Sequence, residues 1–597
     1  MCGICGEVRF DATPPDRGAV ERMSAALARR GPDDQGLHLR GPVALGHRRL
    51  AIIDLTARSH QPMVDPDLGL ALVFNGTIYN YKELRAELAG AGYRFFSEGD
   101  TEVILKAYDR WGEACVERLY GMFAFGLWDE KHQRLLLARD RIGIKPLYYA
   151  EAPDRLRFAS TLPALLAAGD VDTAIDPVGL HHHFTLHAVV PAPRTILRGV
   201  RKVPPATTLT FGPDGRVRSR RYWALRARRP DPPLAEADWV AATHAALLRA
   251  VERRLKIADV PVGVLLSGGL DSSLLVGLLS EAGTGGLQTF SIGFEDAPEE
   301  PGSEFEYSDQ VAKRFATQHH KYRIPNRDVL DRLPEAIGQM AEPMVGQDAV
   351  AFYLLAERVS RSIKVVQSGQ GADEVFAGYF WYPQMHAAGG SPLERFAPFY
   401  FDRDHDEYLQ TVTPRYYTAD ATSALVTEAL TQPEADELID QVLRFDVTTL
   451  IVDDPVKRVD NMTMAWALEA RVPFLDQEVV ELAARMPPEL KLKGGGKHVL
   501  KVIARGLLPD AVIDRTKGYF PVPALKFVRG PFLDFMRAVL SSEACLRRGL
   551  LQRAYVDQLL AEPDRHFTRL NGSKLWHLAL LEAWLQTHVD GAGRMPT

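Results

Sequence analysis

The sequence predicts two domains of different class, an α+β domain followed by an α/β domain with a parallel sheet. Short apolar runs broken by Gly, Pro, Asn and Asp fill residues 1–210 and are typical of strands and hairpins. From residue 237 to residue 597, helical patterns alternate with β-branched runs such as VPVGVLL and IKVVQSG, which favours a parallel sheet covered on both faces. Pro and charged residues accumulate in between, so we expect a linker at 211–236.

The composition excludes several classes of protein. The 597 residues carry a formal net charge of −6, and 46% of them are hydrophobic and 25% charged, as in ordinary globular proteins. A negative net charge gives no indication of the basic surface that binds nucleic acid. We find no signal peptide and no run of about 18 apolar residues, so we expect no membrane contact. Four cysteines are too few for a disulfide framework, which favours a reducing cytoplasm.

The chain begins MCGICGEV, with a cysteine directly after the initiator methionine. Cys2 and Cys5 have the C-x-x-C spacing of a metal or redox pair, but Cys115 and Cys545 stand alone and cannot complete a zinc site. We therefore favour a second interpretation, in which removal of Met1 leaves Cys2 with a thiol and a free α-amino group. Such a residue is a nucleophile that carries its own base.

One amphipathic helix of the first domain can be placed from its spacing. In DTEVILKAYDRWGEACVERL the apolar residues recur at helical intervals, and Asp100 stands where an N-cap is expected. Neighbouring runs such as LALVFNG and GMFAFGLWDEKHQRLLLARD predict strands.

The strongest chemical signal in the second domain is VPVGVLLSGGLDSSLLVGLLSEAG. An apolar strand is followed by Gly268 and Gly269 and then by a helix, an arrangement that lets backbone N–H groups approach phosphate. The Walker pattern is absent, and GGGK at 494–497 lacks its spacing and its hydroxyl residue. Asp271 would repel phosphate unless Mg²⁺ lay between them. We therefore predict a nucleotide site that uses Mg²⁺.

A second carboxylate cluster follows the apolar run in IKVVQSGQGADEVFAGYFWY. Ligands of parallel sheets bind beyond the carboxyl ends of the strands, so we expect Asp373 and Glu374 to face the same crevice as Asp271. The alternative is that Asp373 caps a helix starting at Glu374. The pairing with SGGLDSS favours the first interpretation.

A series of ordered motifs resembles a known family. They are MCGI, RRGPDD, GHRRLAIID, VFNGTIYNY, GDTEVIL, FAFGLWD, ARDRIGIKPLYY, LLSGGLDSS, SGQGADE, LEARVPFLD and RTKGYFPVP. Over nearly all of its length the chain is similar to class II glutamine amidotransferases of the asparagine synthetase type. The resemblance implies an N-terminal-nucleophile (Ntn) glutaminase with αββα layers. It further implies a synthetase domain of the α/β ATP pyrophosphatase (PP-loop, adenine nucleotide alpha hydrolase-like) class.

The resemblance assigns roles in glutamine hydrolysis. Cys2 matches the thiol that attacks the side-chain amide of glutamine, which gives a thioester and free ammonia. Asn75 and the N–H of Gly76 match the oxyanion hole. Arg49 and Asp100, together with Asn75, match the residues that bind glutamine.

The resemblance also implies ATP as a substrate and Mg²⁺ as a cofactor of the second domain. The residues that match the ATP site are Leu265, Ser267, Gly268, Gly269, Asp271, Ser272, Ile292, Ser368 and Gly369. Asp271 and Asp373 match the metal ligands, and Lys517 matches a lysine that stabilises transition-state charge. Family likeness further implies that ammonia passes internally between the two sites and that the protein forms a homodimer.

Three departures from the family pattern bear on the substrates. Where the glutaminase motif usually reads N-G-E the chain has Thr77, so the contact of that glutamate to the amino group of glutamine cannot be carried over. Where S-G-[DE]-G-x-D-E usually has an acid the chain has Gln370, which cannot accept a proton. The stretch AEPMVGQDAVAFYLL, which contains Glu342, replaces the usual D-E-P and D-P-S. We expect Glu342 and Gln370 to border an acceptor other than plain aspartate.

The altered stretches are similar to the branch that amidates the dipeptide N-acetylglutaminylglutamine, giving an osmoprotective dipeptide amide in bacteria. We take this as the leading hypothesis. The alternative within the same chemistry is an asparagine synthetase that tolerates Gln370. A β-lactam synthetase-like cyclase needs no ammonia and so has no use for Cys2. A regulatory pseudo-enzyme would not need Cys2, Asp271, Asp373 and Lys517 together.

Two further groups of residues carry weaker signals. The histidines at 181–183, like His319 and His320, lack the spacing of metal ligands, so we expect them to have local structural roles. The aromatic residues at 379–382 are candidates for the wall of an acceptor pocket, with ordinary packing as the alternative.

Overall fold

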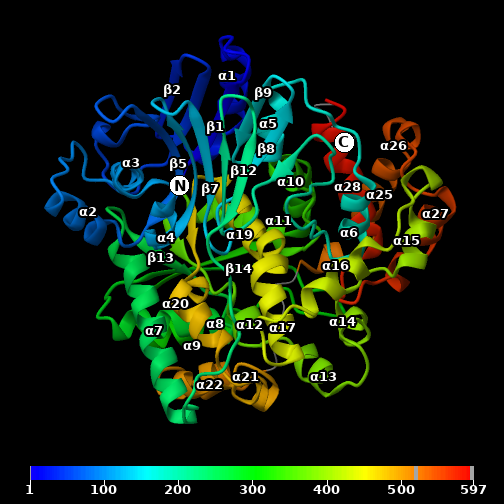
Figure 1. Cartoon of the computed structure of the whole chain (residues 1–597). Coiled ribbons are helices and arrows are strands. Elements are labelled where there is room, and N and C mark those ends of the chain that lie inside the picture. Colours follow the sequence, from blue (N-terminus) through cyan, green and yellow to red (C-terminus); the bar gives the residue numbers. More distant parts are fainter. Residues whose placement is uncertain (1, 516–521, 592–597) are drawn as a thin grey trace.

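The computed structural model describes residues 2–515 and 522–591. Figure 1 shows the strands of the first third of the chain, in blue and cyan, packed against a larger green to red region in which helices surround a third sheet. No helix within the described residues is both long and apolar enough to cross a membrane.

The first sheet has the strand order β10-β8-β9-β1-β3-β2, and its neighbouring strands run antiparallel. Its strands are β1 (Gly3–Arg9), β2 (Asp34–Arg40), β3 (Val43–Arg49), β8 (Tyr148–Ala152), β9 (Arg155–Ala159) and β10 (Arg201–Lys202). The N-terminal strand β1 is therefore an interior strand, which holds Cys2 at the edge of the domain core.

The second sheet has the order β12-β11-β7-β6-β5-β4 and is also antiparallel. Its strands are β4 (Met63–Asp65), β5 (Leu70–Ile78), β6 (Gly121–Asp129), β7 (Arg134–Arg139), β11 (Thr207–Phe211) and β12 (Val217–Arg221). Because β12 pairs with β11, part of the stretch 211–236, where the sequence suggested a linker, belongs to this sheet.

The two sheets face each other across an apolar core. The ring of Phe158 in the first sheet lies so close to the second that a Cβ built at Gly126 would be 2.7 Å from it. The outer faces are covered by α1 (Arg17–Ala26) and α5 (Leu162–Ala167) on one side and by α2 (Tyr81–Gly90) and α3 (Asp100–Trp111) on the other. This arrangement confirms the αββα layers of an Ntn glutaminase.

Helix α3 begins one residue earlier than its sequence suggested. Gly99 is the N-cap and Asp100 is the first helical residue. The carboxylate of Asp100 accepts a hydrogen bond from the backbone N–H of Ile78 in β5, at 3.0 Å, so the side chain points toward the second sheet and does not cap the helix.

The third sheet is parallel and has the order β15-β14-β13-β16-β17. Its strands are β13 (Val262–Leu265), β14 (Gln288–Phe294), β15 (Gln318–Ile324), β16 (Val365–Gln367) and β17 (Glu469–Arg471). The chain adds β14 and β15 on one side of β13 and then crosses to add β16 and β17 on the other. The order therefore reverses between β13 and β16, which is where open α/β sheets bind ligands.

Helices cover both faces of this sheet and form a further helical layer beside it (Figure 1). Around the sheet lie α7 (Glu236–Lys256), α8 (Leu270–Glu281), α9 (Phe305–Arg314), α11 (Asp348–Val359), α12 (Ala372–Val375), α19 (Pro455–Met464), α22 (His498–Arg505) and α28 (Lys574–His588). The adjoining layer contains α6 (Pro177–Thr185), α13 (Trp381–Ala387), α14 (Pro392–Tyr400), α15 (His405–Thr411), α16 (Ala421–Leu430) and α17 (Leu438–Phe445). The middle of α8, residues 272–279, is buried, as the apolar run at 274–279 favours.

Candidate active sites

Cys2 and Asn75 lie together at one end of the two facing sheets of the first domain. The Oδ1 atom of Asn75 in β5 accepts a hydrogen bond from the backbone nitrogen of Cys2 at 2.9 Å. The Nδ2 atom of Asn75 is buried and has no hydrogen-bond partner within the described part of the chain. An amide donor that is left unpaired beside a nucleophile is suited to binding an oxyanion that forms during the reaction.

Packing restricts the residue after Asn75 to glycine. A Cβ built at Gly76 would lie 2.2 Å from the carbonyl oxygen of Met122, so a larger residue cannot be accommodated there. Burial raises the pKa of the Cys2 thiol, which makes a nearby base necessary for forming the thiolate. An α-amino group on the same residue would meet that need.

Arg49 and Asp100 flank this site. The guanidinium of Arg49 is held by the carbonyl oxygens of Thr56, at 3.0 Å, and of Asp54. Burial raises the pKa of Asp100 to about 6, so this carboxylate is largely ionised at neutral pH and becomes protonated in mild acid. The pair offers one positive and one negative group, as binding of an α-amino acid requires.

A carboxylate from the second domain reaches the glutaminase site. Thr77, which stands at the place of the usual glutamate, donates a hydrogen bond of 3.3 Å to Glu469 in β17. Glu469 also accepts a hydrogen bond of 2.5 Å from Arg471, and both side chains are fully buried. Burial alone would raise the pKa of Glu469, but Arg471 outweighs it and lowers the pKa to about 2. Glu469 lies in the motif LEARVPFLD, yet nothing in that pattern indicates its partner in the other domain.

We expect Glu469→Gln to lower the melting temperature strongly, because it leaves the buried Arg471 without its counter-charge. Removing one partner of such a pair lowers the free energy of unfolding by about 3–5 kcal/mol. Thr77→Val is the matched control, since it removes the same interdomain hydrogen bond and leaves the ion pair in place, at a cost of about 1 kcal/mol or less. Equal melting temperatures for the two variants would contradict the assignment. Differential scanning calorimetry measures both.

Further buried ion pairs cross the boundary between the two domains. Asp460 in α19 binds Arg30 at 3.0 Å and Lys145 at 2.9 Å. Arg30 in turn donates to the carbonyl oxygen of Cys2 at 3.2 Å. The backbone of Cys2 is therefore tied to a helix of the second domain.

The second site is a cavity of about 870 Å³ beyond the carboxyl ends of β13 and β16. Of the sequence-predicted ATP residues, the structure places Leu265, Ser267, Gly269, Asp271, Ser272, Ile292, Ser368 and Gly369 on its wall. Gly268 takes the left-handed φ of +84° in the same loop, and a Cβ there would lie 2.7 Å from the backbone nitrogen of Ser308. Glycine is thus required for the turn that precedes α8.

A lysine that the sequence gave no reason to select joins the two carboxylates of this cavity. The Nζ atom of Lys497 lies 2.6 Å from an oxygen of Asp271 and 2.6 Å from an oxygen of Asp373. Burial alone would lower the pKa of Lys497, but the two carboxylates outweigh it and raise the pKa. Asp271 in α8 and Asp373 in α12 therefore converge on one positive charge from the helices that follow β13 and β16, as a shared Mg²⁺ would require. Lys497 ends the GGGK stretch, and Lys517, the lysine expected here, lies outside the described residues.

The far wall of the cavity combines Gln370 with aromatic residues. The rings of Tyr379 and Trp381 stack with centroids 4.3 Å apart, and the hydroxyl of Tyr379 donates to Glu374 at 2.7 Å. Burial raises the pKa of Asp446 to about 8, so this wall carboxyl is largely protonated at neutral pH. The wall is therefore apolar and hydrogen-bonding, with little uncompensated charge.

His187 is a further wall residue that the sequence did not indicate. Its Nδ1 lies 2.8 Å from the buried carboxylate of Asp402, and its backbone takes the left-handed φ of +50°. A non-glycine residue in this conformation is uncommon. It brings the segment after α6 to the cavity wall.

Glu342 does not line the cavity, although the sequence suggested that it borders the acceptor. It is 1% exposed and lies among Lys202 at 3.3 Å, Lys457 at 3.4 Å and the hydroxyl of Tyr148 at 2.8 Å. Burial alone would raise the pKa of Glu342, but the two ammonium groups outweigh it and lower the pKa. Glu342 thus stabilises the contact between the two domains.

The arrangement of two sites agrees with the similarity to known proteins. A family described as "Glutamine amidotransferase domain" matches residues 1–223, and one described as "Asparagine synthase" matches residues 242–586. The chain is 31% identical to "Asparagine synthetase [glutamine-hydrolyzing] 3" of Bacillus subtilis (strain 168), over 98% of this chain and 99% of that protein. It is 30% identical to "Asparagine synthetase B [glutamine-hydrolyzing]" of Escherichia coli (strain K12), over 87% of this chain and 82% of that protein. The chain therefore belongs to the glutamine-hydrolysing asparagine synthetase family, and it is an amidotransferase of the carbon–nitrogen ligase class.

Proposed function

We propose that this enzyme activates the carboxylate of N-acetylglutaminylglutamine with ATP and converts it to the amide with ammonia from glutamine. Residues 1–210 would release the ammonia at Cys2, and residues 237–597 would use it in the cavity beside Asp271. Asp271 and Asp373 would hold Mg²⁺, which offsets the charge of the ATP phosphates when it is bound. The names of the relatives support the amidotransferase chemistry, and the acceptor is inferred from the cavity wall.

The observation that carries the choice of acceptor is that the acidic side chains of the cavity wall already have partners. Most of them form ion pairs: Asp271 and Asp373 with Lys497, Glu300 with Lys526, Glu304 with Arg515, Asp348 and Asp454 with Arg458, and Asp514 with Arg505. The other two accept hydrogen bonds from tyrosine hydroxyls: Glu374 from Tyr379, and Asp446 from Tyr382 and Tyr400. The α-ammonium of aspartate would therefore meet wall carboxylates that already have donors or counter-charges. An N-acetylated dipeptide has no ammonium, and its amides can bond to Gln370 and to the wall hydroxyls.

Aspartate is the second candidate acceptor, because the relatives' names favour it. The test is to incubate the purified enzyme with ATP, Mg²⁺ and glutamine, and to compare AMP release with N-acetylglutaminylglutamine, with aspartate and without acceptor. We expect AMP release only with the dipeptide. Release with aspartate alone would establish an asparagine synthetase, and release of ADP would exclude adenylation.

We expect Gln370→Glu to reduce kcat/KM for the dipeptide by about tenfold, which corresponds to about 1.4 kcal/mol of lost binding. A carboxylate placed against a neutral ligand loses hydration without gaining a counter-charge. The matched control is Gln477→Glu, which makes the same change in α20 (Gln477–Ala484), outside the cavity wall. Faster dipeptide amidation by Gln370→Glu would refute the role of Gln370. Initial rates of AMP release over a range of dipeptide concentrations give the comparison.

A further inference from the structure

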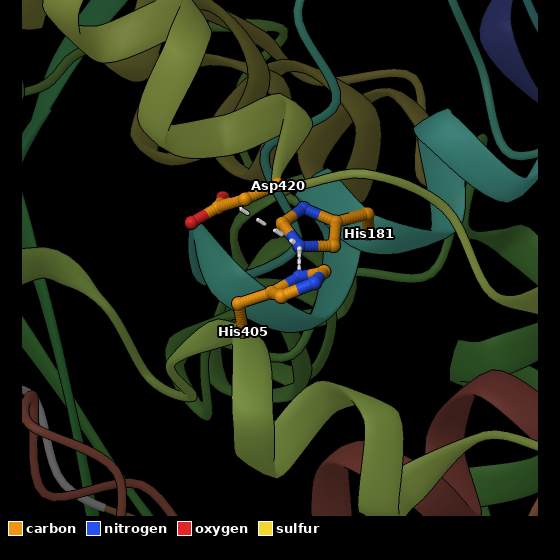
Figure 2. Close-up of side chains that lie close together, drawn as sticks. All are labelled: His181, His405 and Asp420. Atoms are coloured by element: carbon orange, nitrogen blue, oxygen red, sulfur yellow. Dashed lines mark hydrogen bonds and ion pairs between the residues drawn. The ribbon is translucent and has the colours of Figure 1, made fainter.

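Three side chains far apart in the sequence meet outside both sites. His181 extends from α6, His405 begins α15, and Asp420 precedes α16 (Figure 2). The Nε2 atom of His181 lies 3.1 Å from Nδ1 of His405 and 3.8 Å from a carboxylate oxygen of Asp420. One potential metal-ligand atom from each residue lies within 4.8 Å of the other two.

The spacing of these atoms suits a metal ion. In a tetrahedral site with Zn–N bonds of about 2.0–2.1 Å, neighbouring ligand atoms are about 3.3–3.4 Å apart. The observed separations of 3.1 and 3.8 Å lie on either side of that value. Two imidazoles and one carboxylate favour Zn²⁺ or another late divalent transition metal over Mg²⁺ or Ca²⁺.

Hydrogen bonds from neighbouring residues orient His181. Its Nδ1 lies 2.7 Å from the hydroxyl of Thr422, and the same hydroxyl lies 3.0 Å from Nδ1 of His182. Because the hydroxyl has one proton, it can accept from His181 while it donates to His182. With the proton on Nδ1, the lone pair on Nε2 of His181 is directed at His405 and Asp420. A bound cation would favour this tautomer of His181.

The fixed position of Asp420 and the access from solvent meet two further requirements of a ligand set. The carboxylate of Asp420 is held in place because it caps α16, accepting from the backbone N–H of Ser423 at 3.0 Å and from its hydroxyl at 2.6 Å. His405 and Asp420 are half-buried, so an ion and a fourth ligand such as water can reach the site from solvent.

We propose that His181, His405 and Asp420 form a binding site for a divalent transition metal, with Zn²⁺ as the best-fitting ion. The site joins α6, which lies between β9 and β10 in the sequence, to α15 and α16 of the helical layer. None of its three residues lines the 870 Å³ cavity, so its role is to stabilise the packing of these helices. It is separate from the Mg²⁺ site inferred at Asp271.

The test measures Zn²⁺ bound to the full-length protein after removal of metals with a chelator and return to Mg²⁺-containing buffer. We expect one Zn²⁺ per chain with a dissociation constant of about 1 μM or below, and an affinity at least about 100-fold weaker for His405→Ala. Asp420→Asn is the second variant, because asparagine preserves the helix cap while removing the ligand charge. His386→Ala removes an exposed histidine of α13 and should bind Zn²⁺ as the wild type does.

Two further measurements complete the test, the visible absorption of bound Co²⁺ and the melting temperature. Co²⁺ added in place of Zn²⁺ should give the visible absorption of a tetrahedral site in the wild type and in His386→Ala, and should lose it in the other two variants. Zn²⁺ should raise the melting temperature in the same pattern. Wild-type protein that binds no Zn²⁺, or variants at 405 and 420 that bind it with unchanged affinity, would overturn the proposal.

Discussion

Cys2→Ala is expected to abolish glutamine-dependent amidation while amidation from added ammonia continues. The substitution removes the thiol that would attack glutamine, and we expect the glutamine-dependent rate to fall by about 1,000-fold or more. The cavity beside Asp271 is untouched, so free ammonia supplied at raised pH should still be used. The measurement is amide formation with each nitrogen source, together with glutamate release from glutamine.

Cys5→Ala is the matched control for this experiment. Cys5 is fully buried, and burial raises the pKa of its thiol to about 12, so it has no reactive thiolate at neutral pH. We expect Cys5→Ala to hydrolyse glutamine at nearly the wild-type rate. Retention of glutaminase activity by Cys2→Ala would exclude Cys2 as the nucleophile. Equal loss in both variants would instead favour a joint role for the C-x-x-C pair.

Asp271→Asn is expected to stop synthesis with either nitrogen source while glutamine hydrolysis at Cys2 continues. The change halves the carboxylate charge that Asp271 and Asp373 present at the cavity. If Mg²⁺ and the ATP phosphates lose about 3 kcal/mol of interaction in the transition state, the rate falls by about 100-fold or more. AMP and pyrophosphate release, measured with glutamine and with ammonia, gives the comparison.

The control for Asp271→Asn is Asp557→Asn. Asp557 lies on the surface in α27 (Arg553–Ala561) and pairs with Arg553 at 2.6 Å, so the same chemical change is made far from the cavity. A normal synthetic rate for Asp271→Asn would remove the basis for Mg²⁺ binding at this loop. Loss of synthesis in the Asp557 variant would show that the effect is not local.

Much of the fold and of the two sites could be predicted from local sequence. The glycine loop between an apolar strand and an apolar helix follows from neighbouring residues, because strand, turn and helix each have a short-range pattern. The expectation that Asp271 and Asp373 share one crevice also needed only the rule that ligands bind at the carboxyl ends of parallel strands. The structure confirms that placement through their common partner, Lys497.

Residue type alone did not indicate the partners of Glu342 and His181. Glu342 was expected at the acceptor because its stretch departs from the family pattern, but Lys202 and Lys457 hold it in the contact between domains. The histidines at 181–183 have no metal-ligand spacing within the run itself. His181 acquires His405 as a neighbour only through the packing of α6 against α15.

The sequence by itself determined the class of both domains, the two reactive motifs and the chemistry that they support. Only the tertiary structure decided which distant groups complete the sites: Lys497 lies 226 residues from Asp271, and Glu469 lies 392 residues from Thr77. The physical reason is that periodicity and motif spacing record interactions between near neighbours in the chain. Buried charges are paired by the packing of whole sheets and helices, which no local pattern encodes.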